Sequence, residues 1–256
     1  MHLLVAVVLL LFPQAEKAHT FAYKFNKDDQ YKDTKTSEFV LEFRQGPSVV
    51  SFEVDTKEVM RRTVLEVKKG RPTIERVDVL DFTTNIKKHP EQNKIGEQKE
   101  KSVGGRYVWR RIGNVRWGLF SRREEVTIRH RAIVNRLKNW KDKRLPSKPI
   151  KVGDTWEVDI LDYLALSDQQ VPPGSKGTIE YKLKSVDDGI ATIVFSGVWS
   201  YLEAEARTVV TQQGTWKFDL KRGRDLSIEA TADLSMTGAR EGAGRFKSKR
   251  VVEWKK

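Results

Sequence analysis

A cluster of arginine and aromatic side chains is the part of the sequence whose composition could do chemistry. Its candidate anion-binding residues are Arg106, Arg110, Arg111, Arg116, Trp117, Arg122 and Arg123. Guanidinium groups pair with phosphate and carboxylate oxygens, and aromatic rings offer faces on which bases or apolar groups stack. The cluster therefore indicates an anionic partner: acidic lipid head groups at a membrane surface, an anionic envelope polymer or a single-stranded nucleic acid. A solvated face that aids solubility is the alternative.

The sequence offers little for catalysis or for a metal ion. It has no cysteine, and His19, His89 and His130 lack the spacing of metal ligands. Glu157 and Asp159 alternate along a predicted strand and point outward together, whereas the carboxylates of a glycosidase oppose each other. We expect no cofactor, no metal and no catalytic residue. A hydrolase of unrecognised type is the alternative.

The N-terminal residues predict export. Leu3 to Phe12 form an apolar run that is followed by Pro13 and by small and polar residues. The run is shorter than the about 20 residues that cross a bilayer, and it is typical of the apolar region of a secretory signal peptide. We predict a signal peptide over residues 1–18 and a periplasmic, extracellular or envelope location. An uncleaved N-terminal anchor is the alternative, and export argues against nucleic acid as the partner.

Positive charge is concentrated in one section of the chain. The whole sequence carries a formal net charge of +13. Residues 83–151 contain 20 lysines and arginines and 6 aspartates and glutamates, a balance of 20 − 6 = +14. The rest is close to neutral, so we expect one basic section on an otherwise balanced surface.

Short apolar alternations separated by turn residues predict an antiparallel β protein. Predicted strands before the basic section are residues 21–25, 39–43, 50–54, 59–67 and 74–82. Those in the C-terminal half are residues 178–186, 190–195, 198–210, 214–220, 225–236 and 245–254. Residues 84–102 have almost no apolar content and are predicted to form a long loop. Gly238, Gly242 and Gly244 indicate a flexible loop before the last strand.

A β-hairpin is predicted for the basic section. Its strands are residues 106–112 and 115–120, and the Gly-Asn pair between them is typical of a two-residue primed turn. In this register Arg111 lies opposite Arg116. Two opposed arginines repel each other unless their side chains diverge or share an anion.

Residues 121–143 are predicted to form the helix of the fold. Ser121 and Glu124 fit a capping box at its start. An apolar stripe follows the helical spacing and consists of Val126, His130, Ile133, Leu137 and Trp140. We expect the stripe to pack on the sheet, with binding to a membrane surface as the alternative.

The segment Leu145–Asp159 separates the two halves, 19–144 and 145–256, which we expect to form one continuous domain. Pro146 and Pro149 force an extended backbone after the helix. A Gly-Asp turn and a strand with an alternating pattern follow. We expect structural anchors in this half at Pro149, Gly153, Asp154, Trp156 and Trp216.

Leu145-Pro146, followed by Pro149-Ile150 and then by Gly153-Asp154-x-Trp156, resembles a motif of uncharacterised secreted bacterial families. These families have Leu-Pro, then Pro-Val-x-x-Gly-Asp-x-Trp and a β-rich C-terminal half, and here Ile150 replaces the usual valine. The resemblance covers residues 145–235 and brings no catalytic residues. It implies export and a curved antiparallel sheet like the open half-barrels that carry lipids in bacterial envelopes.

The predicted fold is mainly β: a large curved antiparallel sheet or open half-barrel with one amphipathic helix packed on it. The predicted function is a non-catalytic exported binding protein that holds a lipid or other amphiphilic ligand between sheet and helix. An adhesion or scaffold module that binds anionic polymer or membrane through the basic section is the alternative.

Overall fold

The computed structural model describes residues 17–68, 70–90, 95–99, 103–112, 116–120, 144–161, 174–203 and 205–255. Two predictions lie outside these ranges: the signal peptide up to residue 16, and the helix over residues 121–143.

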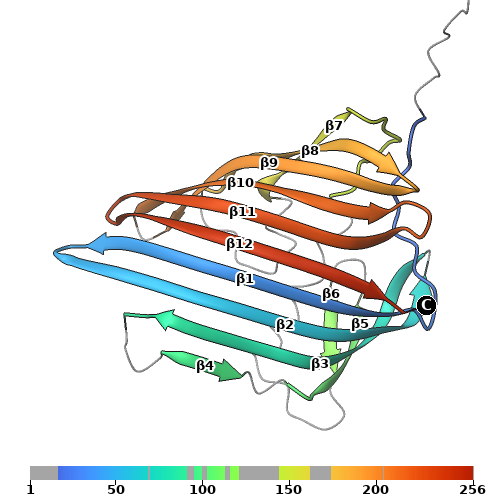
Figure 1. Ribbon diagram of the computed structural model, residues 1–256, viewed down its shortest axis with the longest axis horizontal. Helices are drawn as coiled ribbons and strands as arrows, with labels where there is room; N and C mark the ends of the chain where they lie inside the picture. Colours follow the sequence, from blue (N-terminus) through green and yellow to red (C-terminus); the bar gives the residue numbers. More distant parts are fainter. Residues whose placement is uncertain are drawn as a thin grey trace, which may run out of the picture.

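The described residues form one antiparallel sheet of twelve strands (Figure 1). The strands are β1 (Gln30–Gln45), β2 (Ser48–Lys68), β3 (Arg71–Lys88), β4 (Gly96–Lys99), β5 (Arg106–Ile112), β6 (Arg116–Phe120), β7 (Thr155–Asp159), β8 (Lys176–Asp187), β9 (Ile190–Glu203), β10 (Ala206–Asp219), β11 (Arg224–Gly238) and β12 (Glu241–Trp254). Their order is β6-β5-β3-β2-β1-β12-β11-β10-β9-β8-β7, and β4 lies beside β3. The predicted large antiparallel sheet is confirmed. It is not closed, and its two edges are β6 and β7.

The first and last long strands form the seam of the sheet. β1 pairs with β12 from Tyr31 opposite Trp254 to Arg44 opposite Glu241. Most other neighbours are consecutive in the chain and joined by short turns, so each half is a meander. The seam makes the strands of both halves parts of one sheet.

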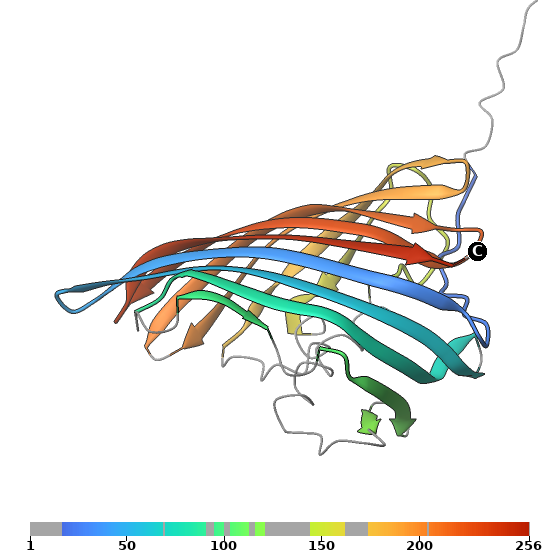
Figure 2. The same cartoon turned by 60° about the horizontal axis from the view of Figure 1, so that its bottom comes forward.

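The sheet is arched, so that it has a concave face and an outer face (Figure 2). Successive side chains of a strand point to opposite faces, and along β8 the inward Ile179, Tyr181 and Leu183 are buried while Glu180 and Lys182 between them are exposed. Four register shifts between β2 and β3 add twist at that side of the arch.

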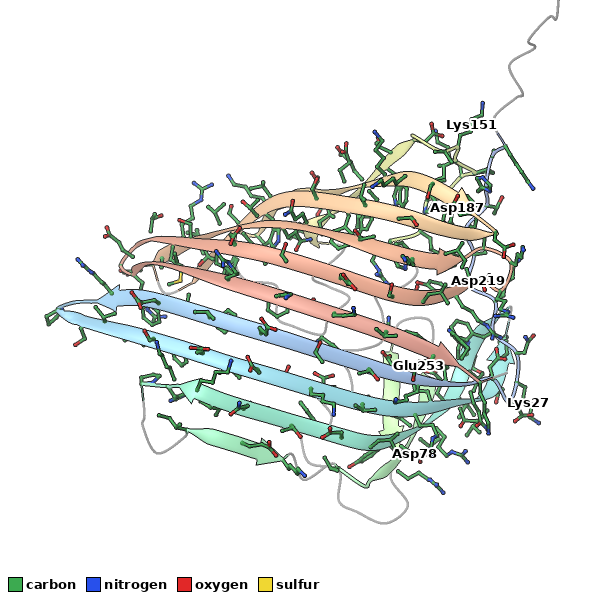
Figure 3. The ribbon with its side chains drawn as sticks, in the orientation of Figure 1. Lys27, Asp78, Lys151, Asp187, Asp219 and Glu253 are labelled. Carbon is green, nitrogen blue, oxygen red and sulfur yellow. The ribbon has the colours of Figure 1, made fainter. Side chains whose placement is uncertain are left out.

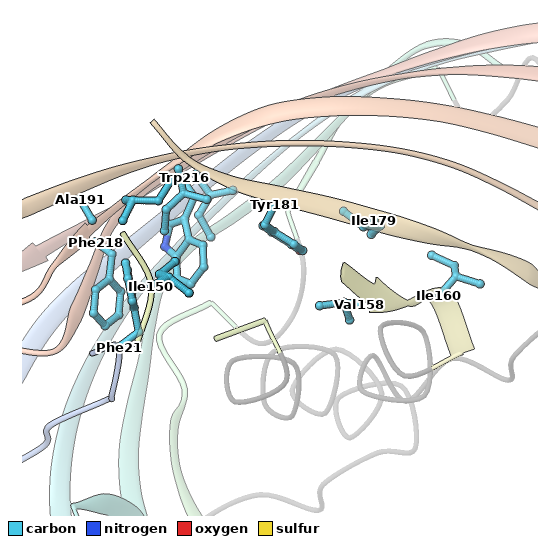
Figure 4. Close-up of a cluster of buried hydrophobic side chains, with 12 residues drawn as sticks. Phe21, Ile150, Val158, Ile160, Ile179, Tyr181, Ala191, Trp216 and Phe218 are labelled. Atoms are coloured by element: carbon cyan, nitrogen blue, oxygen red, sulfur yellow. The ribbon is translucent and has the colours of Figure 1, made fainter. Parts of the chain in front are cut away.

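Two non-sheet segments pack on the concave face at one end. Residues 17–29 run past residues 144–154, and His19 and Ile150 exchange backbone hydrogen bonds of 2.7 and 3.0 Å. Phe21 and Ile150 join the largest apolar cluster among the described residues, together with side chains of β7 to β11 (Figure 4). The predicted strand over residues 21–25 is therefore extended and buried at Phe21 and Phe25, but outside the sheet.

Several predicted strand bounds are wrong. The strands predicted over 50–54 and 59–67 are one strand, β2, and the predicted loop over 84–102 contains the end of β3 and all of β4. The predicted strand over 198–210 spans the turn between β9 and β10. Gly242 and Gly244 lie inside β12 and not in a loop.

The hairpin of the basic section is present as β5 and β6, but its predicted register is wrong. Arg111 lies opposite Trp117, and Ile112 opposite Arg116. The last pair is Ile112 and Arg116, so three residues of sequence separate the paired ends. Three-residue connections are the next most common hairpin loops after two-residue turns.

Candidate functional site

The concave face has two halves. One is covered by residues 17–29 and 144–161, and we call it the closed half; the other has partly exposed apolar side chains, and we call it the apolar half. In the closed half, nearest the C-terminus, the inward side chains are buried under residues 17–29 and 144–161, as Ile193 on β9 and Trp216 on β10 show. Toward the other end of the sheet many inward side chains are partly exposed, whereas Val210, Thr208 and Ala206 on β10 remain buried there. The first partly exposed inward side chain is Phe195 on β9 and Ser248 on β12.

The apolar half is formed by inward side chains of β9, β11, β12, β1, β2 and β3 near the far hairpin ends. Its partly exposed apolar members are Trp199, Tyr201, Leu234, Met236, Phe246, Phe39, Leu41, Val50, Phe52, Val54 and Ile86. At about 4.8 Å between strands and about 3.3 Å per residue, it extends roughly 30 Å across the strands and 13 Å along them. An area on the order of 400 Å² equals the largest apolar patches of typical monomers, which are often binding sites.

A polar row separates the apolar half from the closed half. We call it the hydroxyl row, and it consists of Ser248, Ser37, Thr56 and Thr84, which lie opposite one another on β12, β1, β2 and β3. All four are partly exposed, and the Ser37 and Thr56 hydroxyl oxygens are 2.6 Å apart. One step nearer the closed half, Lys35 forms an ion pair of 3.9 Å with Glu58.

A buried ion network lies in the closed half, across the seam. Its charged members are Asp33, Arg62, Glu75, Arg144, Asp225 and Arg250, each at most 9% exposed. The Arg250 guanidinium donates two bonds of 2.7 Å to the Asp33 carboxylate and one of 3.1 Å to Asp225. Arg62 lies 3.6 Å from Asp33 and 3.9 Å from Glu75. Three cations thus meet three carboxylates, which offsets the cost of burying them.

Tyrosine and tryptophan complete this network. Tyr23 donates a hydrogen bond of 2.9 Å to Asp225, and so does Trp216 through its indole N–H at 3.1 Å. Tyr31 donates to Glu75 at 3.0 Å. Burial, aided by the neighbouring carboxylates, raises the pKa of Tyr23 and of Tyr31 well above the usual value, so both stay protonated donors. Burial lowers the pKa of Arg250, but Asp33 and Asp225 together raise it further, so the net shift of this pKa is upward.

Sequence reasoning missed the charged residues of this network. A signal was present in the alternation of β12, where Arg250 shares the inward positions of Val252 and Trp254. An inward charge on a half-buried strand indicates a buried partner. The partners could not be named, because Asp33 is 217 residues away in the chain.

The predicted anchors occupy the closed half. The turn has Gly153 at φ +95°, and the Asp154 side chain accepts a bond of 2.8 Å from the Lys151 N–H. Trp156 stacks on Tyr181 at 5.4 Å and donates to the Arg144 carbonyl. Trp216 is fully buried, whereas Pro149 is exposed.

The structure places the predicted anion-binding residues at one edge of the sheet. Arg106 begins β5 with its side chain 68% exposed, and it pairs with Asp78 at 2.7 Å. Arg110 and Arg111 lie on β5 and Arg116 and Trp117 on β6, where the structure describes only the backbone. Arg122 and Arg123 lie outside the described residues.

The outer face is charged and carries both signs, as the side chains in Figure 3 show. Its ion pairs include Lys32–Glu253, Lys57–Asp81, Lys87–Asp55, Arg245–Asp233 and Lys249–Glu229. Two shallow hollows of about 650 and 680 Å³ are lined mainly by side chains of this face, around Lys57 and around Lys249. Residues of the other face also line them: Ser37 and Thr56 the first hollow, and Phe195 and Ser248 the second.

Within the described ranges, no three or more His, Cys, Asp or Glu side chains are placed to hold a metal ion. The same part of the chain contains no helix with the length and apolar character needed to cross a membrane.

No protein-family model and no curated protein sequence matches this chain. Among solved structures, it is similar to lipovitellin, in a structure concerned with lipid–protein interactions, with a TM-score of 0.52 and 8% sequence identity. That likeness covers 91% of this chain and 26% of the lipovitellin chain, so this chain spans about a quarter of that length. The translocator domain of the autotransporter NalP from Neisseria meningitidis matches with a TM-score of 0.23 and 10% identity, with 89% of each chain covered. At this identity, the likeness to lipovitellin shows a shared fold alone.

Proposed function

We propose that this protein is a non-catalytic binding protein that holds the apolar chains of a lipid or other amphiphile on the apolar half of its concave face. The observation that carries the proposal is the contrast between the two faces. Phe39 and Phe246 lie opposite each other on the concave face, whereas their neighbours Val40 and Arg245 point outward into a charged surface. Covering this footprint of about 400 Å² is worth at most on the order of 10 kcal/mol before the cost of association, because its side chains are already partly buried.

Two further points support this proposal. The sheet shares its fold with lipovitellin, a protein whose structure was studied for its lipid interactions. The signal peptide predicted from the sequence agrees with this role, because an exported protein would meet amphiphiles that pass between membranes. In the proposal, the helix predicted over residues 121–143 covers the ligand from the side opposite the sheet.

The alternative, binding of an anionic polymer or membrane through the basic section, rests on sequence. Arg106, whose side chain is described, already pairs with Asp78. The described outer face is a mixture of paired charges and not a surface of one sign, so the structure adds no support to this alternative.

A charge placed on the concave face should weaken lipid binding, and the same charge on the outer face should not. We expect Phe39→Glu to weaken the binding of a fluorescent fatty acid to delipidated protein at least tenfold, because a carboxylate would be buried under the acyl chain. The control is Val40→Glu, since Val40 is the next residue of β1 and is 46% exposed on the other face. Equal affinities of the two variants, with unchanged circular dichroism, would rule out the concave face as the site.

A further inference from the structure

We infer that the hydroxyl row is a head-group site, and that the protein prefers amphiphiles whose polar group is uncharged and carries hydroxyl or ester oxygens. This inference rests on the proposed function, which it extends from the chains of the ligand to its head.

The position of the hydroxyl row matches the length of an amphiphile laid along the strands. One step from Ser37 toward the hairpin ends, the inward residue of β1 is Phe39, and the next is Leu41. A step of two residues is about 6.6 Å. The face therefore changes from hydroxyl groups to aromatic rings within the length of a small head group, and chains lying on the apolar half would bring their polar ends to the row.

The hydroxyl groups of the row can reach a ligand. The row members are partly exposed, as are Lys35 and Glu58 beside them, whereas Asp33, Met60 and Arg250 nearer the closed end are buried. Ser37 and Thr56 face each other at 2.6 Å, and a pair of hydroxyls has both a donor and an acceptor left for a third group. When a ligand covers these hydroxyl groups, they lose their hydrogen bonds to water. This loss costs free energy unless the ligand provides new hydrogen-bond partners.

The charges beside the row favour a head group without net charge. Lys35 is the cation nearest to it on β1, and Glu58 faces Lys35 at 3.9 Å. The next cation on this face, Arg250, is held by Asp33 and Asp225. An anionic head would therefore meet a carboxylate beside each cation, and it would gain little over an uncharged one.

The test compares ligands that share one acyl chain length and differ in the head: a monoacylglycerol, the fatty acid anion and the plain alkane. Affinities are measured for the wild type, for the double variant Ser37→Ala/Thr56→Val, and for the control Thr36→Val, whose side chain lies on the outer face. We expect the double variant to bind the monoacylglycerol about tenfold more weakly, as for the loss of two hydrogen bonds. Alkane binding should stay unchanged, and the control should match the wild type for all three ligands.

Two results would overturn the inference while leaving the proposed function intact: an equal loss for monoacylglycerol and alkane in the double variant, or tighter binding of the anion than of the monoacylglycerol by the wild type. Failure of the wild type to bind any of the three ligands would instead remove the proposed function, and the inference with it.

Discussion

Arg250 is the residue on which the buried ion network depends. Its guanidinium contacts Asp33 from the N-terminal half of the chain and Asp225 from the C-terminal half. A planar guanidinium can bind one carboxylate with two parallel bonds and still donate to another. A lysine has a single point of charge and could not hold both carboxylates with this geometry.

Replacing Arg250 by methionine should destabilise the protein strongly. The substitution keeps an apolar stem but leaves Asp33 and Asp225 with one fewer cation in a buried site, which costs about 3–5 kcal/mol. Urea unfolding followed by circular dichroism measures the loss. The control is Lys249→Met at the neighbouring outward position, whose exposed pair with Glu229 should contribute less than about 1 kcal/mol. Similar losses in the two variants would mean that the network does not stabilise the fold.

At the scale of elements, glycines allow the sheet to bend toward its concave face. Gly214 on β10 points inward, and a Cβ there would collide with the Glu229 carbonyl and with the ring of Phe195, which covers the glycine. At Gly242 on β12, a Cβ would collide with the Glu42 carbonyl and with the Cα and Cβ of Phe43. An aromatic side chain that covers a glycine on the neighbouring strand is a recurrent feature of curved sheets.

Gly214→Val should therefore be destabilising, although valine favours strands elsewhere. We expect a loss of about 1–3 kcal/mol, because the backbone of β11 or the Phe195 ring must move. Thermal unfolding is a suitable measurement. Ala243→Val, at an exposed outward position of β12, should change stability by less than about 0.5 kcal/mol. If Gly214→Val were as stable as the wild type, close packing at this glycine would not shape the sheet.

The sequence predicts the existence of the strands better than their lengths. Two residues of the hydroxyl row explain why the predicted bounds of β2 and β3 are wrong. Apolar alternation correctly indicates that β2 and β3 exist. It fails where the inward residue becomes polar, at Thr56 on β2 and Thr84 on β3. At these points the pattern is typical of a loop. Apolar alternation alone therefore predicts two strands in place of β2 and a strand shorter than β3. Thr56 and Thr84, two of the positions at which the local pattern misleads, belong to the hydroxyl row that we propose to contact the ligand head.

At the scale of the whole molecule, the seam between β1 and β12 could not be predicted, because its partners lie at opposite ends of the chain. Hairpins are indicated by local turn residues, but pairing between residues about 200 positions apart leaves no local signal. The seam also explains why the sheet is open. The chain starts and finishes its long strands in the middle of the sheet, so the edges are strands from the middle of the sequence, β6 and β7.

The seam predicts that the two halves of the chain unfold together. Fourteen residue pairs join β1 to β12, and the ion network crosses the same line, so neither half can lose its structure without exposing the other. Hydrogen exchange of the native protein, measured by mass spectrometry, should give the inner segments of β2 and β9 the same free energy of opening at the global limit. Arg250→Met should lower both by the same amount. If β9 kept its protection while β2 opened, the halves would be independent, and the concave face would be a junction between two sheets and not one continuous surface.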